Sequence, residues 1–198
     1  MTDRAPWDCH PDLTEDRLQR LARFFADTAI EVASEHKPQN GDDAWSLGCR
    51  RNAWWRNRML EIQKSGDWQW FQIISPTKGF VFAIGSVPVR FYRGHHGRPP
   101  NNTLATRSDE LRQISLAFGQ SELGELKWRF SIETDRYGKP VSVVFAGLKD
   151  DGTISCYWPI PFEAEVVSFP ASTYTPPVAV DIAAPQVDSP AADETQAG

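Results

Sequence analysis

The sequence has few cysteines, and none of them are closely spaced. The 198 residues include Cys9, Cys49 and Cys156, which are odd in number and far apart. This pattern argues against a disulfide framework and against a structural zinc site, which needs four organised ligands. We therefore expect ordinary thiols, and the sequence implies no metal and no other cofactor.

Long apolar runs are also missing. No run approaches the roughly 20 apolar residues that a membrane-spanning helix needs. The polar segment Met1–Asp12 lacks the basic start and the apolar stretch of a secretory signal. We therefore expect a cytoplasmic protein that has no membrane partner.

The end of the sequence lacks the residues that build a core. From Pro170 to Gly198 there is no Trp, Phe, Lys or Arg. Such a segment cannot bury enough apolar surface to offset the entropy lost on ordering. We predict a single folded domain over residues 1–169 and a disordered, acidic, Pro- and Ala-rich tail over residues 170–198.

The rest of the chain contains ample apolar material. Apolar residues make up 40% of the sequence, and eight residues are Trp. Spacings of three and four between apolar residues predict helices over residues 13–36, 44–64 and 108–118. Asp12 with Glu15 has the form of a capping box for the first helix, and Asp42 or Asp43 can cap the second.

Other segments change to a period of two. Aromatic and β-branched residues predict strands over residues 68–75, 79–84, 87–93, 126–132, 141–148 and 153–158. In residues 126–132 the apolar positions alternate with Lys127, Arg129 and Ser131, which predicts one buried face and one solvated face. Pro88 predicts that its strand lies at a sheet edge or begins after the proline.

These elements together indicate an α+β fold class. We predict an antiparallel sheet of about six strands with two or three helices packed on one face. Short turns join the last three strands, so we expect those strands to be antiparallel neighbours. The first two helices precede the sheet in the sequence, and we expect them to share a face.

The charges are segregated along the chain. The net charge is −5, but residues 50–112 hold 11 Lys and Arg against 4 Asp and Glu, a local charge of +7. Residues 150–198 hold no basic and eight acidic side chains. Because the local electric field steers a ligand, the negative net charge of the whole chain is compatible with an anionic partner.

A basic, Trp-containing surface is the main candidate site. Helix geometry places Arg51, Trp54 and Arg58 in one stripe, where guanidinium groups suit phosphates and an indole can stack on a base. The candidate anion- or nucleic-acid-binding residues are Arg50, Arg51, Trp54, Arg56, Arg58, Arg90, Arg93 and Arg98. The alternative is that the arginine stems pack on Trp faces at the rim of the core.

Catalytic patterns are incomplete. His95 and His96 are adjacent, so on a strand they point to opposite faces and do not readily share a metal. Glu125 and Lys127 form part of the E-x-K pattern of metal-dependent nucleases, with a solvated strand face as the plain alternative. Two further acids, which are expected beside a turn, are Glu133 and Asp135.

Three functions follow as hypotheses. The first is a non-enzymatic module that binds a polyanion, nucleic acid before others. The second is a protein-interaction or regulatory module that docks on a charged partner. The third is a metal-dependent nuclease or phosphate-ester enzyme. In addition, the acidic tail could compete with an anionic ligand for the basic surface.

Overall fold

The computed structural model describes residues 4–77, 79–106, 108–118 and 126–162. The helices, one of them the 3₁₀ helix η1, are α1 (Pro6–Cys9), α2 (Glu15–Ser34), η1 (Pro38–Asn40), α3 (Ala44–Ser65), α4 (Asn101–Leu104) and α5 (Ser108–Phe118). The strands are β1 (Phe71–Ser75), β2 (Val81–Ile84), β3 (Val87–Arg93), β4 (Lys127–Thr134), β5 (Pro140–Leu148) and β6 (Ile154–Pro159). They form one six-stranded sheet in the order β1-β2-β3-β4-β5-β6, which confirms the α+β class.

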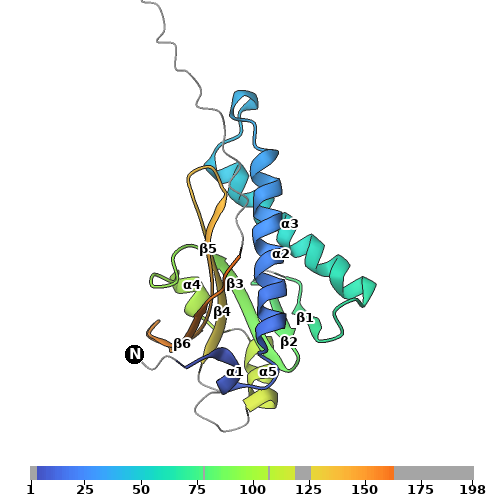
Figure 1. Ribbon diagram of the computed structural model, residues 1–198, viewed down its shortest axis with the longest axis vertical. Helices are drawn as coiled ribbons and strands as arrows, with labels where there is room; N and C mark the ends of the chain where they lie inside the picture. Colours follow the sequence, from blue (N-terminus) through green and yellow to red (C-terminus); the bar gives the residue numbers. More distant parts are fainter. Residues whose placement is uncertain (1–3, 78, 107, 119–125, 163–198) are drawn as a thin grey trace, which may run out of the picture. The chain divides into compact units, whose positions relative to one another are not determined.

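The two long helices pack on one face of the sheet (Figure 1). The ring of Phe25 in α2 lies 5.5 Å from that of Trp55 in α3 and 5.3 Å from that of Phe130 in β4, measured between centroids. The Trp55 indole also donates a 3.0 Å hydrogen bond to the carbonyl oxygen of Phe25. The apolar faces predicted for both helices thus meet in the main core.

The helix starts agree with the sequence for α3 and differ for α2. Asp43 caps α3 in a capping box, in which it accepts a 2.8 Å hydrogen bond from the Ser46 amide. The predicted box of Asp12 and Glu15 is wrong, because Thr14 is the N-cap of α2. The Asp12 carboxylate instead accepts 2.9 Å hydrogen bonds from the amide and the hydroxyl of Ser86. It therefore joins the segment before α2 to the β2–β3 turn.

The second face of the sheet is covered as well. The predicted solvated face of β4 is wrong, since Lys127, Arg129 and Ser131 are all buried. The connection from β3 to β4 carries α4 and α5 onto this face. Arg129 there forms a 2.5 Å ion pair with Glu110 of α5 and donates a 2.9 Å hydrogen bond to the carbonyl of Thr103. Charged groups are buried on this face because they pair with one another.

The sheet is antiparallel except at its centre, where β3 and β4 are parallel. Pro88 therefore lies in an interior strand, and its predicted place at a sheet edge is wrong. A two-residue turn makes Ile84 and Val87 a hydrogen-bonded pair, so the nitrogen of Pro88 faces away from β2. Pairing with β4 begins one residue later, at Val89, so no ladder bond to β4 is lost.

One edge of β3 is left open by the short β2. In the described residues β2 pairs with Val87–Val89, and no strand pairs with residues 90–93 on that side. The first half of α3 lies there instead. Phe91 packs on Trp55 at 5.5 Å between ring centroids, and a guanidinium nitrogen of Arg93 is 3.8 Å from where a Cβ on Gly48 would stand. The open edge of β3 and the start of α3 therefore face each other.

Two further predictions concern the ends and the surroundings of the fold. The predicted tail over residues 170–198 lies outside the described part of the chain. None of the helices within the described ranges combines the length and the apolar character that a bilayer crossing requires. The thiols of Cys9 and Cys156 are free and buried, whereas that of Cys49 is free and exposed.

Candidate anion-binding site

The arginines of α3 point in different directions. Arg50 turns toward the loop before α3, where its guanidinium lies 3.1 Å from the Asp42 carboxylate. Arg58 reaches α2, forms a 2.7 Å ion pair with Glu31, and lies over the ring of Trp54 at 4.8 Å. Both charges are therefore balanced within the fold, and one face of the Trp54 indole is covered. The contact of Arg58 with Trp54, and that of Arg51 with the ring of Trp55 at 5.6 Å, is the rim packing that the sequence offered as the alternative interpretation.

Arg51 points between α3 and the sheet. Its side chain is 1% exposed, and one guanidinium nitrogen donates to Thr134 Oγ1 at 3.3 Å and to the carbonyl of Gly138 at 3.1 Å. The other nitrogen, Nη2, has no hydrogen-bond partner among the described residues. Burial, and then the charge of Arg93, lower the pKa of Arg51 to about 10, so the group is still a cation at neutral pH.

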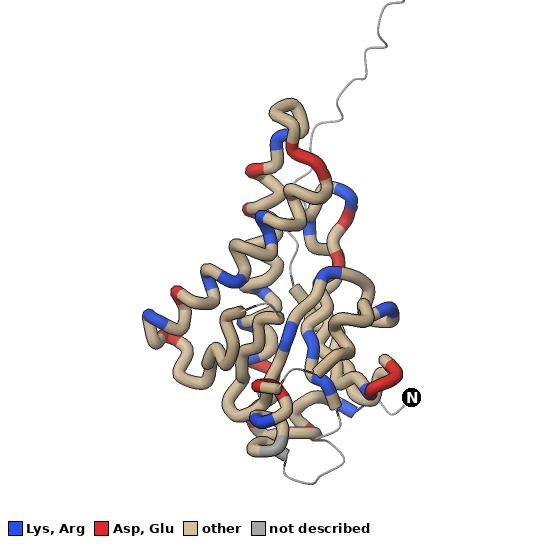
Figure 2. Tube along the Cα trace, turned by 180° about the vertical axis from the view of Figure 1, so that it is seen from behind, with Lys and Arg blue, Asp and Glu red and all other residues tan. Residues whose placement is uncertain are grey.

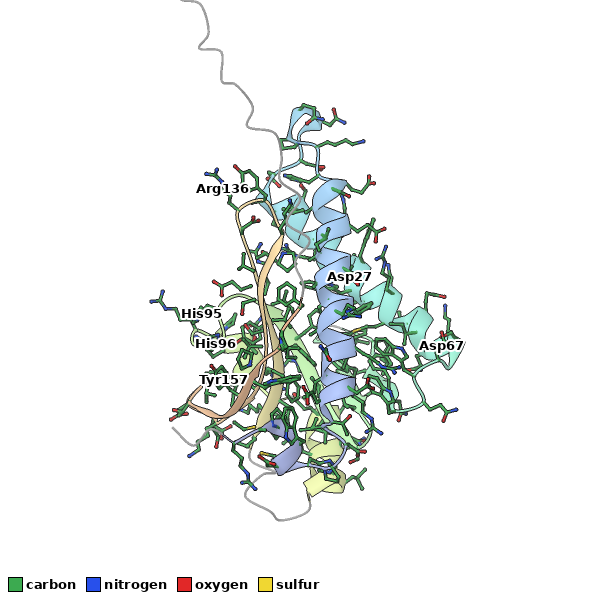
Figure 3. The ribbon with its side chains drawn as sticks, in the orientation of Figure 1. Asp27, Asp67, His95, His96, Arg136 and Tyr157 are labelled. Atoms are coloured by element: carbon green, nitrogen blue, oxygen red, sulfur yellow. The ribbon has the colours of Figure 1, made fainter. Side chains whose placement is uncertain are left out.

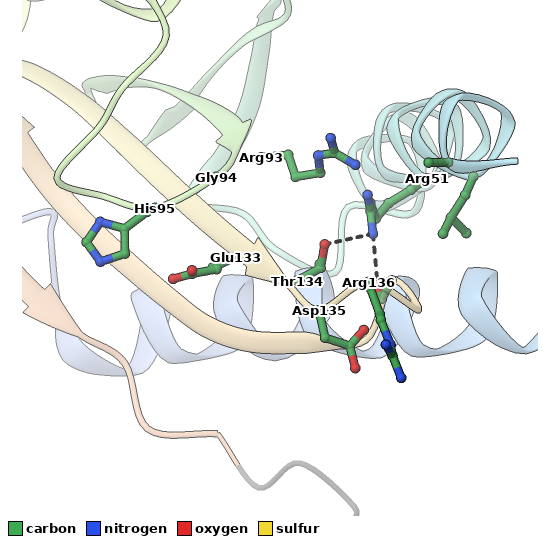
Figure 4. A pocket seen from close by; sticks show the side chains of 11 residues that line it. Arg51, Arg93, Gly94, His95, Glu133, Thr134, Asp135 and Arg136 are labelled. Atoms are coloured by element: carbon green, nitrogen blue, oxygen red, sulfur yellow. Dashed lines mark hydrogen bonds between the residues drawn. The ribbon is translucent and has the colours of Figure 1, made fainter.

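Arg93 ends β3 and faces the same space. In Figure 4 its guanidinium lies next to that of Arg51. Neither arginine has an ion-pair partner in the ranges that the structure describes. A cavity of about 480 Å³ opens here between the start of α3, the end of β3 and the β4–β5 turn. We call it the arginine pocket and define it by Arg51, Arg93, Thr134 and Gly138.

Acidic side chains also line this pocket but do not neutralise the two arginines. Asp135 Oδ1 accepts hydrogen bonds of 2.8 and 2.9 Å from the amides of Tyr137 and Lys139, and so it holds the turn together. In Figure 4 the carboxylates of Asp135 and Glu133 point away from the paired guanidinium groups. Two like charges thus converge with no counter-charge between them, an arrangement suited to an anion.

A second hollow, of about 180 Å³, lies further along the same helix and strand. Arg56 lines it and donates hydrogen bonds to the carbonyls of Pro76 and Thr77, which leave its charge unbalanced. Arg90 lines it too, but it is buried, donates a 2.8 Å hydrogen bond to the carbonyl of Ala105, and lies 3.8 Å from Glu110. Figure 2 shows basic positions along both α3 and β3. The two hollows thus follow one helix and one strand edge.

The loop after β3 contains the remaining predicted residue, Arg98, which is exposed. The rings of His95 and His96 stack at 4.2 Å, and that of Tyr157 stacks on His96 at 5.6 Å. Figure 3 shows these three side by side. Burial first, and the nearby His95 second, lower the pKa of His96, so its imidazole is neutral at pH 7.

The structure describes only part of the nuclease pattern. Glu125 lies outside the described residues, and Lys127 forms a 2.5 Å ion pair with Asp150. Within the part of the chain that is described, no three His, Cys, Asp or Glu side chains gather in a way that could hold a metal ion.

Some residues of the pocket were not among the sequence candidates. Thr134 and Gly138 accept hydrogen bonds from Arg51 across 83 and 87 positions of the chain. Trp45, one residue after the pocket-lining Ala44, is 76% exposed. The sequence shows that a Trp lies in the first turn of α3, but it does not show that this side chain is exposed. No protein-family model, curated protein or solved structure matches this chain.

Proposed function

We propose that the chain is a non-enzymatic binding module for a polyanion, specifically nucleic acid, which it contacts along α3 and the open edge of β3. The observation that carries the proposal is the convergence of Arg51 and Arg93 without a counter-charge. Guanidinium groups bind phosphate oxygens through paired hydrogen bonds and keep their charge at any physiological pH.

Ion pairs within the fold reduce the number of arginines that are available to bind nucleic acid. Ion pairs inside the protein already balance part of the basic segment, through Arg50–Asp42, Arg58–Glu31 and Lys64–Glu61, and Arg90 shares the Glu110 carboxylate with Arg129. In the described ranges, no such pair forms at Arg51, Arg56, Arg93 and Arg98. The exposed Trp45 adds an aromatic face on which a base can stack. The contact surface is therefore smaller than the sequence predicted, and it is centred on the two hollows.

The experiment is a titration of tryptophan fluorescence with short single-stranded oligonucleotides at two or more salt concentrations. We expect saturable quenching, with an affinity that falls steeply with salt because each neutralised phosphate releases counterion. Arg93→Ala should weaken binding and reduce the slope of log K against log salt by about 0.7, the value for one contact with a single strand. Trp45→Ala should weaken binding and remove part of the quenching.

The matched control is Arg23→Ala. Arg23 is an exposed arginine on α2 and lines neither hollow, so its loss should leave affinity and salt slope nearly unchanged. No response to oligonucleotide at low salt would overturn the proposal. A protein that co-purifies with the chain in the absence of nucleic acid would then favour docking on a charged protein partner instead.

A further inference from the structure

The arginine pocket differs in charge from the rest of the basic surface. Arg51 is fixed by Thr134 and Gly138 and is almost fully buried, while Arg93 approaches it from the end of β3 (Figure 4). Two full positive charges therefore point at one small volume. A phosphodiester or a carboxylate brings one negative charge, whereas a phosphate monoester brings close to two at neutral pH, since its second pKa is about 6.

The walls of the pocket also limit what can lie beside such a group. Glu133, Asp135 and Arg136 line the side that lies away from Arg51 and Arg93, and in Figure 4 the Arg136 guanidinium lies beside the Asp135 carboxylate while that of Glu133 points away from all three arginines. A strand that continued past the pocket toward Glu133 would bring its next phosphate near this carboxylate, and like charges repel. A strand that ends in the pocket avoids this repulsion.

Gly138, which lines the pocket, packs closely against α3. This residue has a φ of +87°, and a Cβ on it would stand 2.9 Å from Leu47 Cδ2 and 3.4 Å from Arg51 Nη1. The turn therefore contacts the helix directly and holds the Arg51 guanidinium in place. A fixed guanidinium loses little freedom on binding, which favours tight binding of an oxyanion.

We propose that the arginine pocket binds the terminal phosphate monoester of a nucleic-acid strand, through Arg51 Nη2 and the guanidinium of Arg93. This inference rests on the proposed function and adds to it that the module recognises a strand end. Thr134 Oγ1, which accepts from Arg51, keeps a hydroxyl proton that it can donate to a phosphate oxygen.

The test compares three octanucleotides of one sequence, with a 5′-phosphate, with a 3′-phosphate, or with hydroxyls at both ends. Binding to the full chain is measured at fixed salt by fluorescence anisotropy with an internal label. We expect one of the two phosphorylated strands to bind about tenfold more tightly than the hydroxyl strand. A matching strand whose terminal phosphate is capped as a methyl diester should bind like the hydroxyl strand.

The variant Arg93→Ala tests whether the terminal phosphate binds in this pocket. Arg93 is exposed at the end of its strand, so its replacement should leave the fold intact. In this variant all strands should bind alike. The control Arg23→Ala should keep the tenfold preference. Circular dichroism of each variant checks that the fold is unchanged.

The other outcomes are separable. Equal binding of all strands by the unaltered protein would overturn the strand-end inference and leave the proposed function standing. A preference that survives Arg93→Ala would place the end phosphate elsewhere and also overturn it. A mononucleotide that bound as tightly as the phosphorylated octanucleotide would overturn the strand as the ligand. Binding of no strand at all would overturn the proposed function and this inference with it.

Discussion

At the scale of single residues, Arg51 shows how a charged group is accommodated in the fold. Burial of a charge is unfavourable unless hydrogen bonds or an opposite charge compensate it. Arg51 has two neutral acceptors, the ring face of Trp55 at 5.6 Å and no carboxylate in the described part of the chain, so no opposite charge compensates its own. Such a residue is expected where a ligand completes the set of partners. This distinguishes Arg51 from Arg129, whose buried charge is met by Glu110.

The turn that holds Arg51 gives the first prediction. Gly138→Ala should lower the free energy of unfolding more than Gly41→Ala does. Both glycines have positive φ angles, +87° and +91°, but a Cβ on Gly41 meets nothing within 4 Å. Gly41→Ala should therefore cost about 1–2 kcal/mol, the backbone penalty alone. Gly138→Ala should cost roughly 1–3 kcal/mol more, because its Cβ would crowd Leu47.

Urea denaturation of the two variants checks this difference. Gly41 is the matched control, since it isolates the backbone penalty from the contact with α3. Equal losses of stability for the two variants would contradict the close approach of the turn to Leu47 and Arg51. Binding of a 5′- or 3′-phosphorylated strand should also weaken in Gly138→Ala and stay unchanged in Gly41→Ala.

At the scale of elements, polar side chains join segments that are distant in the sequence. Asp12 is the clearest case, because its carboxylate receives hydrogen bonds from Ser86 of the β2–β3 turn and from Arg17 of α2. Burial raises the pKa of Asp12, but the hydrogen bonds from Ser86 and Arg17 outweigh it, and the net pKa lies below the usual value. The sequence placed this residue in a helix cap because the Asp-x-x-Glu spacing carries no information about a turn 74 positions away.

Asp12→Asn is therefore expected to make stability depend less on pH. A carboxylate whose pKa is lower in the folded state stabilises the fold above its unfolded pKa and loses this contribution as pH falls through its folded pKa. At pH 7 the variant should be less stable by about 1–2 kcal/mol, allowing for partial exposure. The difference should shrink below about pH 4.

Thermal or urea unfolding at pH 7, 5 and 3 measures the stability difference between Asp12→Asn and the unaltered protein, with Asp27→Asn as the control. Asp27 is exposed on α2 (Figure 3), and its replacement should change stability little at any pH. A loss for Asp12→Asn that is the same at pH 3 as at pH 7 would show that the charge of Asp12 is not what joins the two elements.

The ion pair between α5 and the sheet gives the next prediction. Glu110 and Arg129 are both 0% exposed, so removing one partner leaves a buried charge without compensation. Glu110→Gln should lower the free energy of unfolding by roughly 3–5 kcal/mol. Glu61→Gln, which breaks the exposed pair with Lys64, should cost under about 1 kcal/mol.

Chemical denaturation of both variants checks this prediction. If Glu110→Gln were as mild as Glu61→Gln, the second face of β4 would be solvated, as the alternation in the sequence predicts. The alternation led to a wrong prediction of a solvated face because it shows which side chains are polar and not which are buried. Lys127 and Arg129 are polar in the sequence, and only the crossover that brings α4 and α5 onto them explains why they are buried.

At the scale of the whole molecule, local patterns predicted the elements and missed how they meet. Periodicity placed α2, α3 and the six strands within a few residues of their observed bounds, since core burial repeats with the period of each element. The parallel pairing of β3 with β4 is not encoded by such periods. For the site, the sequence singled out Arg51 and Arg93, but their convergence depends on how α3 packs beside the end of β3. The ion pairs of Arg50 and Arg58 depend instead on the loop before α3 and on the packing of α2 against α3.

The charge segregation along the chain leads to the last prediction, which concerns the acidic tail. The four acids within residues 170–198 are Asp181, Asp188, Asp193 and Glu194. A tethered anionic segment competes with a ligand at an effective concentration set by its tether. Replacing the four acids with Asn and Gln in the full-length chain should therefore tighten oligonucleotide binding at low salt by several-fold.

The gain should fade as the salt concentration rises to about 1 M, where the Debye length falls to about 3 Å. Arg93→Ala should reduce the gain, because the tail and the ligand would then compete for a weaker site. A chain shortened to residues 1–169 separates charge from length. If shortening tightens binding and neutralisation does not, the tail acts by occupying space, and electrostatic competition is excluded. If neither change alters affinity, the tail does not occupy the basic surface, and the +7 charge of residues 50–112 acts on ligands without internal competition.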